Sequence, residues 1–557
     1  MSTTTSAAVA ELIRDAIAVY QDDPVAREAL EDHARRLDEP LRIAVAGMVK
    51  AGKSTLINAI IGEEIAPTDT GECTRMVTWY RYGDTPRVSM LPVDGEPRSL
   101  RVKRVAGRLV FDVGDTGAEE VERLVVDWPV KSLRGIIVID TPGIASLSGV
   151  VSARSTDFLI PQEGASQADA IIYVMRHLHE ADLKFLQAFR DASGAPDAVN
   201  ALAVLSRADE IGAGRIDSLV AARDIARRYR NDDTVRSLAM GVIPVAGLLA
   251  QSARTLRQAE FASLVRIAGL DRAERDQLLL SADRFIRSGG TTAGSADARS
   301  ALLDRFGLFG IRLATVLILS GVTDPTALAR ELSRRSGLDD LVRLIGNQFR
   351  VRSSQLKARA ALVGVETLLR QRPHAGTETL VASLERIRAG AHEFRELRLL
   401  AMARTTGLPL TPALAEEAIR LIGGDGTAVS ERLGLPEDAP PDRVRAEALD
   451  QVLSWRTRSE NPFATRATAE ACQTVVRSCE AILAQLQEDS GGFATARPVL
   501  HPEPGGGAGD EGEYHRRAGK HELRQQEDAE VGHQFLGGDD HGIHEDPDGG
   551  LNHQNNQ

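Results

Sequence analysis

The hydrophobic positions in the first 38 residues follow helical spacing in two segments. In the first segment, apolar side chains recur every three or four residues, at Val9, Leu12, Ile13, Ile17 and Tyr20. This spacing predicts one buried face of a helix. Asp23-Pro24 then has the composition of a helix cap followed by a first-turn proline. The pattern predicts an N-terminal helical segment over residues 1–38.

The pattern changes over residues 39–255, where short β-branched runs alternate with helical stretches. The runs are Arg42–Ala46, Val77–Tyr82, Gly135–Ile139, Ala170–Met175, Ala201–Leu205 and Gly241–Val245. Such alternation is typical of an α/β fold, with a mostly parallel sheet and helices on both of its faces. Within 87–113, Asp94-Gly95 predicts the turn of an inserted hairpin.

Helical spacing returns over residues 256–490. One apolar seam is Leu341, Ile345, Phe349, Leu356 and Val363, and another is Leu380, Leu384, Ile387, Ala391, Phe394, Leu397 and Ala401. Long helices with one apolar seam bury it against each other, so we expect an elongated helical bundle. The last segment, 491–557, is rich in Gly, Pro, Asp, Glu and His, and we expect it to be a disordered acidic tail.

Charge and composition narrow the function classes. The chain has a net charge of −12, and the residues from 493 onward carry 13 acidic and 5 basic side chains. The remaining body is nearly neutral, which argues against a nucleic-acid binder. The three cysteines lack metal-site spacing and are expected to be reduced, packed thiols of a cytoplasmic protein. We expect neither a signal peptide nor a spanning helix, because the most apolar stretch, Leu308–Val322, is short and contains Arg312.

The strongest chemical signal follows the first β-branched run. It is Gly47-Met48-Val49-Lys50-Ala51-Gly52-Lys53-Ser54, and a helical pattern begins at Thr55. Glycines at these positions let the backbone N–H groups of the loop point at phosphate oxygens, and the helix N-terminus adds positive potential. Lys53 is expected to reach the β- and γ-phosphates, and the Ser54 hydroxyl to bind Mg²⁺. Strand, loop and helix together predict a P-loop.

Two further segments match a GTPase site. The third run ends in Asp140-Thr141-Pro142-Gly143; Asp140 is expected to hold Mg²⁺ through water and the Gly143 N–H to contact the γ-phosphate. Between this segment and the P-loop lies a polar loop over 68–75, of the type that closes over the γ-phosphate and Mg²⁺. Thr74 is the predicted metal and catalytic threonine, with Thr70 as the alternative.

Selection of guanine is predicted from the strand end Ser206-Arg207-Ala208-Asp209. A carboxylate at Asp209 accepts two hydrogen bonds from guanine, and adenine would leave this acceptor unpaired. Arg207 replaces the lysine whose stem usually packs on the base. After the last strand, the backbone N–H of Ala246 is predicted to meet the guanine O6.

Hydrolysis needs a group at the γ-phosphate that the sequence does not supply in the usual place. Ile144 follows Gly143, where small GTPases carry a water-orienting glutamine. Lys50 is the candidate substitute, since its ammonium could offset charge in the transition state. The alternative is that Lys50 faces solvent or an acidic partner.

These motifs, with Pro67-Thr68, Cys73-Thr74 and Trp79–Gly83, resemble bacterial dynamin-like GTPases. The segment Leu205–Gly212 is similar to the isoniazid-inducible dynamin-like proteins of mycobacteria. The resemblance is specific over about 40–250 and architectural over 250–490. It implies a GTPase head on a helical neck and trunk, with the N-terminal helices joining the neck.

The resemblance also implies function and partners. Family members dimerise through their heads, which stimulates hydrolysis, as a homodimer or with a related dynamin-like protein. Many bind or remodel membranes, which implies a cytoplasmic location at the inner face of the membrane and links to envelope-stress tolerance. Candidate lipid-contacting tips are 308–322 and 405–437, with a buried helix and a surface connector as the alternatives. Two other functions stay open: a weakly hydrolysing GTP-dependent scaffold and a ribosome-assembly-type GTPase.

Overall fold

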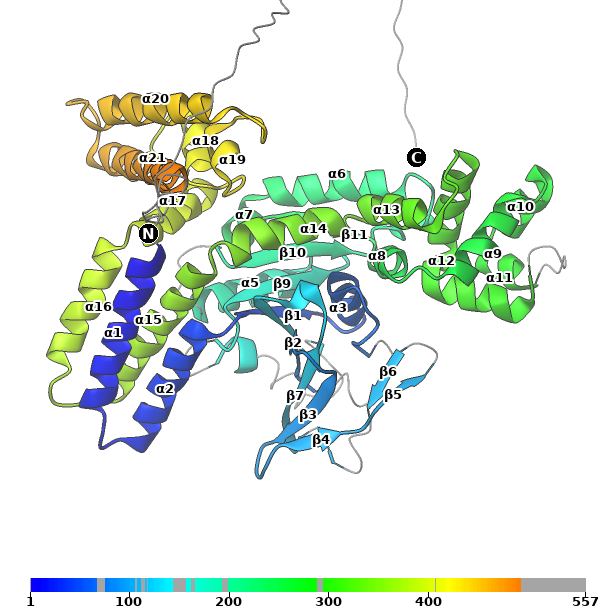
Figure 1. Cartoon of the computed structure of the whole chain (residues 1–557), viewed down its shortest axis with the longest axis horizontal. Helices are drawn as coiled ribbons and strands as arrows, with labels where there is room; N and C mark the ends of the chain where they lie inside the picture. The colour runs from blue at the N-terminus through cyan, green and yellow to red at the C-terminus, as the bar shows by residue number, and fades with distance from the viewer. Residues whose placement is uncertain are drawn as a thin grey trace, which may run out of the picture. The chain divides into compact units, whose positions relative to one another are not determined.

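A nine-stranded mixed sheet forms the centre of the described part of the chain (Figure 1). The computed structural model describes residues 2–67, 76–105, 108–111, 116–117, 119–143, 157–161, 166–192, 199–287, 294–405 and 407–491. The strand order is β11-β10-β9-β1-β8-β2-β7-β3-β4. The strands are β1 Leu41–Gly47, β2 Thr78–Tyr82, β3 Arg87–Pro92, β4 Arg98–Leu100, β7 Val121–Trp128, β8 Ile136–Asp140, β9 Ala170–Met175, β10 Ala201–Ser206 and β11 Val242–Val245, while β5 Val102–Val105 pairs only with β6 Arg108–Phe111.

Five neighbouring strands, β8, β1, β9, β10 and β11, run parallel. All six predicted strands are present, and the α/β fold class is confirmed. The predicted hairpin is β3–β4, whose turn uses Gly95 at a φ of 110°. The sequence analysis missed β7, which pairs parallel to β2 and antiparallel to β3. Because the five parallel strands share one direction, their carboxyl ends meet at one edge of the sheet.

Helices surround the sheet and continue beyond it. The helices up to the end of the sheet region are α1 Ser2–Val19, α2 Pro24–Asp38, α3 Lys53–Ile61, α5 Glu180–Ala192, α6 Ser218–Asn231, α7 Asp233–Leu238 and α8 Gly247–Arg254. The later helices are α9 Gln258–Ala268, α10 Arg272–Leu278, α11 Ala282–Arg287, α12 Ala296–Leu319, α13 Pro325–Ser336, α14 Leu338–Leu344, α15 Ser353–Gln371, α16 Glu378–Gly390, α17 His392–Thr405, α18 Pro412–Leu421, α19 Val429–Leu433, α20 Pro441–Ser459 and α21 Arg466–Gly491. The predicted cap is present, since Asp23 accepts hydrogen bonds from the N–H groups of Val25 and Ala26.

The N-terminal helices form a bundle with α15 and α16. Their shared core includes Leu12, Tyr20, Leu30, Leu362 and Leu384, all buried. The N-terminal helices α1 and α2 therefore belong to one helical bundle with α15 and α16, while the assignment of this bundle as a neck stays a prediction. Four amphipathic helices bury their apolar faces together in this way.

Both predicted seams are corrected by the structure. Leu341, Ile345, Phe349 and Leu356 pack in the core under the sheet rather than in the bundle. The second seam is not one helix, because Ala391 adopts an extended ψ of 117° and separates α16 from α17. Helical spacing identifies an apolar face but does not say which neighbour covers it.

The remaining helices form two further cores. The α12 helix packs with α8, α9 and α13, and residues 308–322 supply buried Phe309, Ile311 and Leu313. This supports the buried-helix alternative for that stretch. Helices α17–α21 enclose Trp455 together with Cys472 and Cys479, which are free and buried as expected. Within the described residues, no helix combines the length and apolarity needed to span a bilayer.

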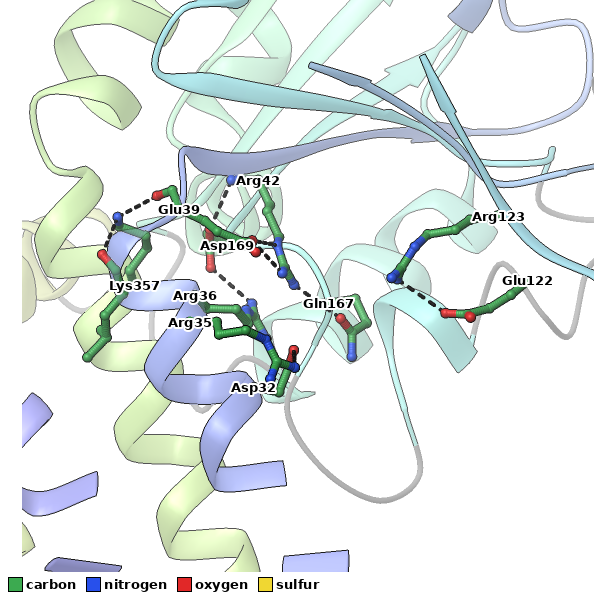
Figure 2. A network of polar contacts seen from close by, with 11 residues as sticks. Asp32, Arg35, Arg36, Glu39, Arg42, Glu122, Arg123, Gln167, Asp169 and Lys357 are labelled. Carbon is green, nitrogen blue, oxygen red and sulfur yellow. Dashed lines mark hydrogen bonds and ion pairs between the residues drawn. The ribbon is translucent and has the colours of Figure 1, made fainter. Parts of the chain in front are cut away.

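A buried polar network joins α2, β1, the segment before β9, and α15 (Figure 2). Asp169 accepts hydrogen bonds from the Arg36 guanidinium at 3.0 Å and from the Arg42 backbone N–H at 2.9 Å. The Lys357 ammonium donates to the carbonyls of Leu37 and Glu39 at 2.6 and 2.7 Å. The sheet and the bundle are thus connected by charged groups rather than by chain continuity alone.

Candidate functional site

The loop after β1 has the backbone of a phosphate-binding loop. Its φ values are positive at Gly47 (148°), Lys50 (62°) and Gly52 (95°), and α3 begins directly at Lys53. A side chain at Gly47 is excluded, because a Cβ there would lie 2.1 Å from the Val174 carbonyl oxygen. This curled backbone directly before a helix N-terminus is the geometry that binds phosphate.

Lys53, Ser54 and Asp140 converge at the carboxyl edge of the sheet. The Lys53 ammonium donates to the carbonyls of Gly47 and Met48 at 3.2 and 3.3 Å, so it folds back over the loop. The Ser54 hydroxyl donates to the Asp140 carboxylate at 3.0 Å. These two oxygens come from residues 86 positions apart in the chain, and both are hard donors of the type that Mg²⁺ prefers.

Burial shapes the electrostatics of this cluster. Desolvation raises the pKa of Asp140 to about 6, and Lys53 and the Ser54 hydroxyl oppose that shift. Desolvation also lowers the pKa of Lys53, while Asp140 raises it. A bound cation favours the ionised carboxylate, and a bound triphosphate favours the ammonium. The site therefore places a carboxylate that suits a bound cation beside an ammonium that suits a bound triphosphate.

Gly143 lies against the phosphate loop. A Cβ at Gly143 would lie 2.5 Å from Val49 Cγ2 and 2.9 Å from Val49 Cα. The neighbouring Thr141 is buried, and its hydroxyl donates to the Val45 carbonyl at 3.0 Å, which ties the end of β8 to β1. The sequence analysis missed this role of Thr141. The apolar Val49 side chain is 46% exposed and sits beside the predicted γ-phosphate sensor.

The predicted base-reading segment contacts the phosphate loop directly. Arg207 has a φ of 51°, and its guanidinium donates to the Lys50 carbonyl at 3.4 Å and to Glu210 at 2.6 Å. Ser206 is buried, and its hydroxyl donates to the Met175 carbonyl, so it holds β10 on β9. Burial raises the pKa of Asp209, with Glu210 adding to the shift. The contact between Arg207 and Lys50 was not predicted, since nothing in the sequence pairs them.

Ala246 follows β11, and its backbone N–H has a partner within the chain. The Ala208 N–H donates to the Val245 carbonyl, so Val245 faces β10, and the alternation of a strand points Ala246 toward the free edge. There the Ala246 N–H donates to the Ser336 carbonyl at 2.9 Å. A contact with guanine O6 would have to replace this bond, and that contact stays a prediction. The covering turn between α13 and α14 could not be anticipated from the local sequence.

Other predicted positions are placed less fully. Ala51 is buried in the loop, and Thr55 lies in the first turn of α3, near Gly247. Lys50 is exposed. Thr70, Thr74 and Ile144 lie outside the described residues.

Comparison with known proteins finds one matching family and several related bacterial proteins. Residues 43–196 match the model of the Dynamin family. The chain is 40% identical over 489 residues to the isoniazid-induced protein IniC of Mycobacterium tuberculosis, covering 86% of this chain and 99% of the relative. It is also 30% identical over 145 residues to the isoniazid-induced protein IniA of the same organism, covering 25% of this chain and 22% of the relative.

More distant relatives share only part of the chain. A bacterial dynamin-like protein of Nostoc punctiforme is 33% identical over 114 residues, which are 18% of this chain and 16% of the relative. A solved structure of an oligomerised bacterial dynamin pair covers 89% of this chain and 76% of its own, at 11% identity and a TM-score of 0.32. That structural likeness is weak.

Proposed function

Because the chain belongs to the dynamin family of GTPases, we propose that it binds GTP together with Mg²⁺ and hydrolyses it. The observation that carries this proposal is the convergence of Lys53, Ser54 and Asp140 beside a phosphate loop with the required backbone. In this arrangement the N–H groups from Gly47 to Thr55 bind the phosphates, with Lys53 on the β- and γ-phosphates. Ser54 and Asp140 would hold Mg²⁺, together with Thr74.

The base would lie against the loop after β10. Asp209 accepts the paired donors of guanine, and the stem of Arg207 packs on the ring, in place of the usual lysine. The hydrogen bond from Arg207 to the Lys50 carbonyl supports this, because it fixes the base-reading segment relative to the phosphate loop. The Ala246 N–H would meet the guanine O6, and this contact would replace its bond to the Ser336 carbonyl.

Lys50 is proposed to act in hydrolysis. The apolar Val49 side chain beside Gly143 cannot orient a water molecule, whereas Lys50 is exposed and in a left-handed conformation at the loop. When bound, Mg²⁺ neutralises charge between the β- and γ-phosphates. The Lys50 ammonium adds positive charge where the transition state develops negative charge, and the Gly143 N–H orients the γ-phosphate.

The domain division that supports this activity is also a proposal. Residues 39–255 form the GTPase domain, residues 256–490 the neck and trunk with residues 1–38, and 491–557 a tail. We propose that the heads pair, as a homodimer or with a related dynamin-like protein, and that hydrolysis is coupled to membrane binding at the inner face of the cell membrane. The partial match to IniA supports a partner of the same family.

Single-turnover GTP hydrolysis measured over a range of protein concentrations tests the proposal. We expect the rate constant to rise with concentration, and Lys53→Ala to abolish nucleotide binding. Lys50→Ala should bind GTP normally but hydrolyse it about 10³-fold more slowly. A flat, negligible rate with intact GTP binding would instead favour the GTP-dependent scaffold. Repeating the series with anionic vesicles tests the membrane coupling separately.

A further inference from the structure

Positively charged side chains gather beside β11, the edge strand of the sheet. A cavity of about 260 Å³ opens there between α6 and the α13–α14 pair, with Ala208 and Pro244 in its wall. Its charged lining consists of Arg223, Arg227 and Arg230 from α6, Arg335 from α13, and Arg343 and Asp340 from α14. We call this cavity the arginine pocket. Five arginines face one aspartate in a chain whose net charge is −12.

The arginines of this pocket are only partly neutralised. The three ion pairs are Arg227 with Asp224 at 3.1 Å, Arg335 with Glu331 at 3.1 Å, and Arg343 with Asp340 at 2.8 Å. All three join residues three or four positions apart on one helix, a type of pair that contributes little and rearranges readily. Within the described part of the chain, Arg223 and Arg230 form no ion pair.

The spacing of these charges is unfavourable for the isolated helix. Arg223, Arg227 and Arg230 recur at four and three positions, so they share one face of α6. Like charges at this spacing destabilise a helix. In addition, Arg335 Nε is buried and has no hydrogen-bond partner within the described residues. Repelling charges and an unpaired buried donor are both relieved by a bound anion.

We propose that the arginine pocket binds a small soluble ligand carrying two or three linked phosphates. Guanidinium groups bind phosphate through paired hydrogen bonds, which a single lysine cannot reproduce. Among the described residues that line the pocket none is aromatic, so it offers no stacking surface for a base. Its place in a recess between helices suits a free molecule better than a headgroup held in a flat bilayer.

The pocket shares a wall with the proposed base-reading segment. Ala208 lies between Arg207 and Asp209, and its N–H donates to the Val245 carbonyl. A ligand that tightens α6 against β11 therefore acts on the segment that positions Asp209. This coupling, unlike the pocket itself, rests on the proposed guanine site. By linkage, the ligand and GDP change each other's affinity by the same factor.

Isothermal titration of the full-length protein with inorganic tripolyphosphate tests the pocket. The protein is first titrated with GDP, which tests the phosphate loop, and is then kept in excess GDP in magnesium-free buffer. We expect one further equivalent of tripolyphosphate to bind, more weakly as salt rises. Arg223→Gln with Arg230→Gln should weaken this binding at least about tenfold, since two charged contacts are lost. The matched control is Arg215→Gln with Arg228→Gln, which removes the same charge outside the pocket.

The outcomes distinguish failure of the arginine pocket proposal from failure of the proposed nucleotide site. Absence of a second binding event in GDP-saturated protein overturns the proposal, as does equal weakening in the pocket and control variants. Binding to phosphatidylglycerol vesicles without binding of tripolyphosphate also overturns it, in favour of a membrane headgroup. If GDP itself fails to bind while the pocket variants still differ from the control, the proposed function fails and the pocket stands. Thermal unfolding without ligand checks that the pocket variants fold, and relief of repulsion predicts no loss of stability.

Discussion

Asp140 is a residue at which stability and ligand binding require opposite charge states. Burial raises its pKa from 3.8 to about 6. Between pH 4 and 6, native protein without nucleotide therefore holds a proton on Asp140 that the unfolded chain has released. The contribution of Asp140 to the free energy of unfolding falls as the pH rises through this window. Binding of Mg²⁺ needs the ionised form and therefore has the opposite dependence.

We predict that magnesium-dependent GTP binding weakens as the pH falls below about 6. A single proton with this pKa weakens the affinity about tenfold at pH 5. Calorimetric titrations with a non-hydrolysable GTP analogue from pH 5 to 8 measure the effect. Asp140→Asn should bind weakly at every pH, and GDP binding in EDTA should lack the step at pH 6. A wild-type affinity that is constant from pH 5 to 8 would contradict the assignment.

Gly143 gives a second prediction at this scale. Gly143→Ala places a methyl group within 2.9 Å of the Val49 backbone, so the two loops must separate. We expect GTP hydrolysis to fall at least about tenfold, because a shift of the γ-phosphate contacts misplaces the reacting groups. Gly390→Ala is the matched control, because its added methyl group meets no atom within 4 Å. Equal single-turnover rates for both variants would show that the close approach has no catalytic consequence.

Some residues of the site are placed by local sequence, and others are placed by contacts with distant parts of the chain. Lys53, Ser54 and Asp140 were predictable because strand, loop and helix are local, and parallel strands bring their ends together. Ala246 was not, because its partner Ser336 lies 90 positions away at an edge that the local pattern does not describe. The link between Arg207 and Lys50 was hidden for the same reason.

At the scale of elements, periodicity identified helices but not their neighbours. The apolar run through Ile345 and Phe349 was correctly read as one buried face, yet it covers the sheet. The run over 380–401 keeps its spacing across Ala391, where the backbone is extended. Gly390, the last residue of α16, is a local signal for this break, but the continuous apolar spacing favoured one helix instead. The strand β7 was missed because acidic residues interrupt its apolar alternation.

The contact between α2 and α15 supports a prediction of its own. A Cβ at Gly364 would lie 2.1 Å from His33 Nε2, so the two helices approach closely. Gly364→Ala should lower the free energy of unfolding by roughly 1–3 kcal/mol through overpacking. Gly346→Ala, with open space around its added methyl group, should have a much smaller effect. Urea unfolding curves for the two variants make the comparison.

His33 makes the same contact sensitive to pH. Desolvation, together with Arg36 and Arg42, lowers its pKa from 6.5 to about 4. Between these values the unfolded chain binds a proton that the native state excludes, so stability is lost as the pH falls from about 6.5 to 4. His33→Gln should remove this part of the pH dependence, measured as the urea midpoint at several pH values. An unchanged profile would mean that His33 titrates freely.

At the scale of the whole molecule, the order of the chain conceals which parts are neighbours. Residues 1–38 precede the sheet but pack with α15 and α16, more than 300 positions later. The sequence indicated only that amphipathic helices need partners, and the expectation that residues 1–38 join a later helical bundle came from the family resemblance. The polar network of Figure 2 was not predicted from either, since Arg36, Asp169 and Lys357 are far apart in the chain.

That network should contribute strongly to stability because its central pair is buried. The Arg36 and Asp169 side chains are only 5% and 2% exposed, and Asp169 also accepts the Arg42 backbone N–H. Asp169→Asn leaves the Arg36 charge buried without a counterion, a change that costs about 3–5 kcal/mol. Arg36→Met removes that charge, so we expect the double variant to unfold with less destabilisation than the sum of the two single variants. Urea unfolding followed by tryptophan fluorescence gives the three values.

The matched control is the exposed pair Arg466–Glu470, whose side chains are 93% and 62% exposed. Arg466→Gln should leave the urea midpoint unchanged, because solvent screens that pair.

Asp169 directly precedes β9, and Val174 near the other end of this strand packs against Gly47 of the phosphate loop. Loss of the pair should therefore loosen β9 and weaken GDP binding as well as stability. Additive effects of the two single variants, with GDP affinity unchanged, would mean that the pair neither couples the helices to the sheet nor supports the loop.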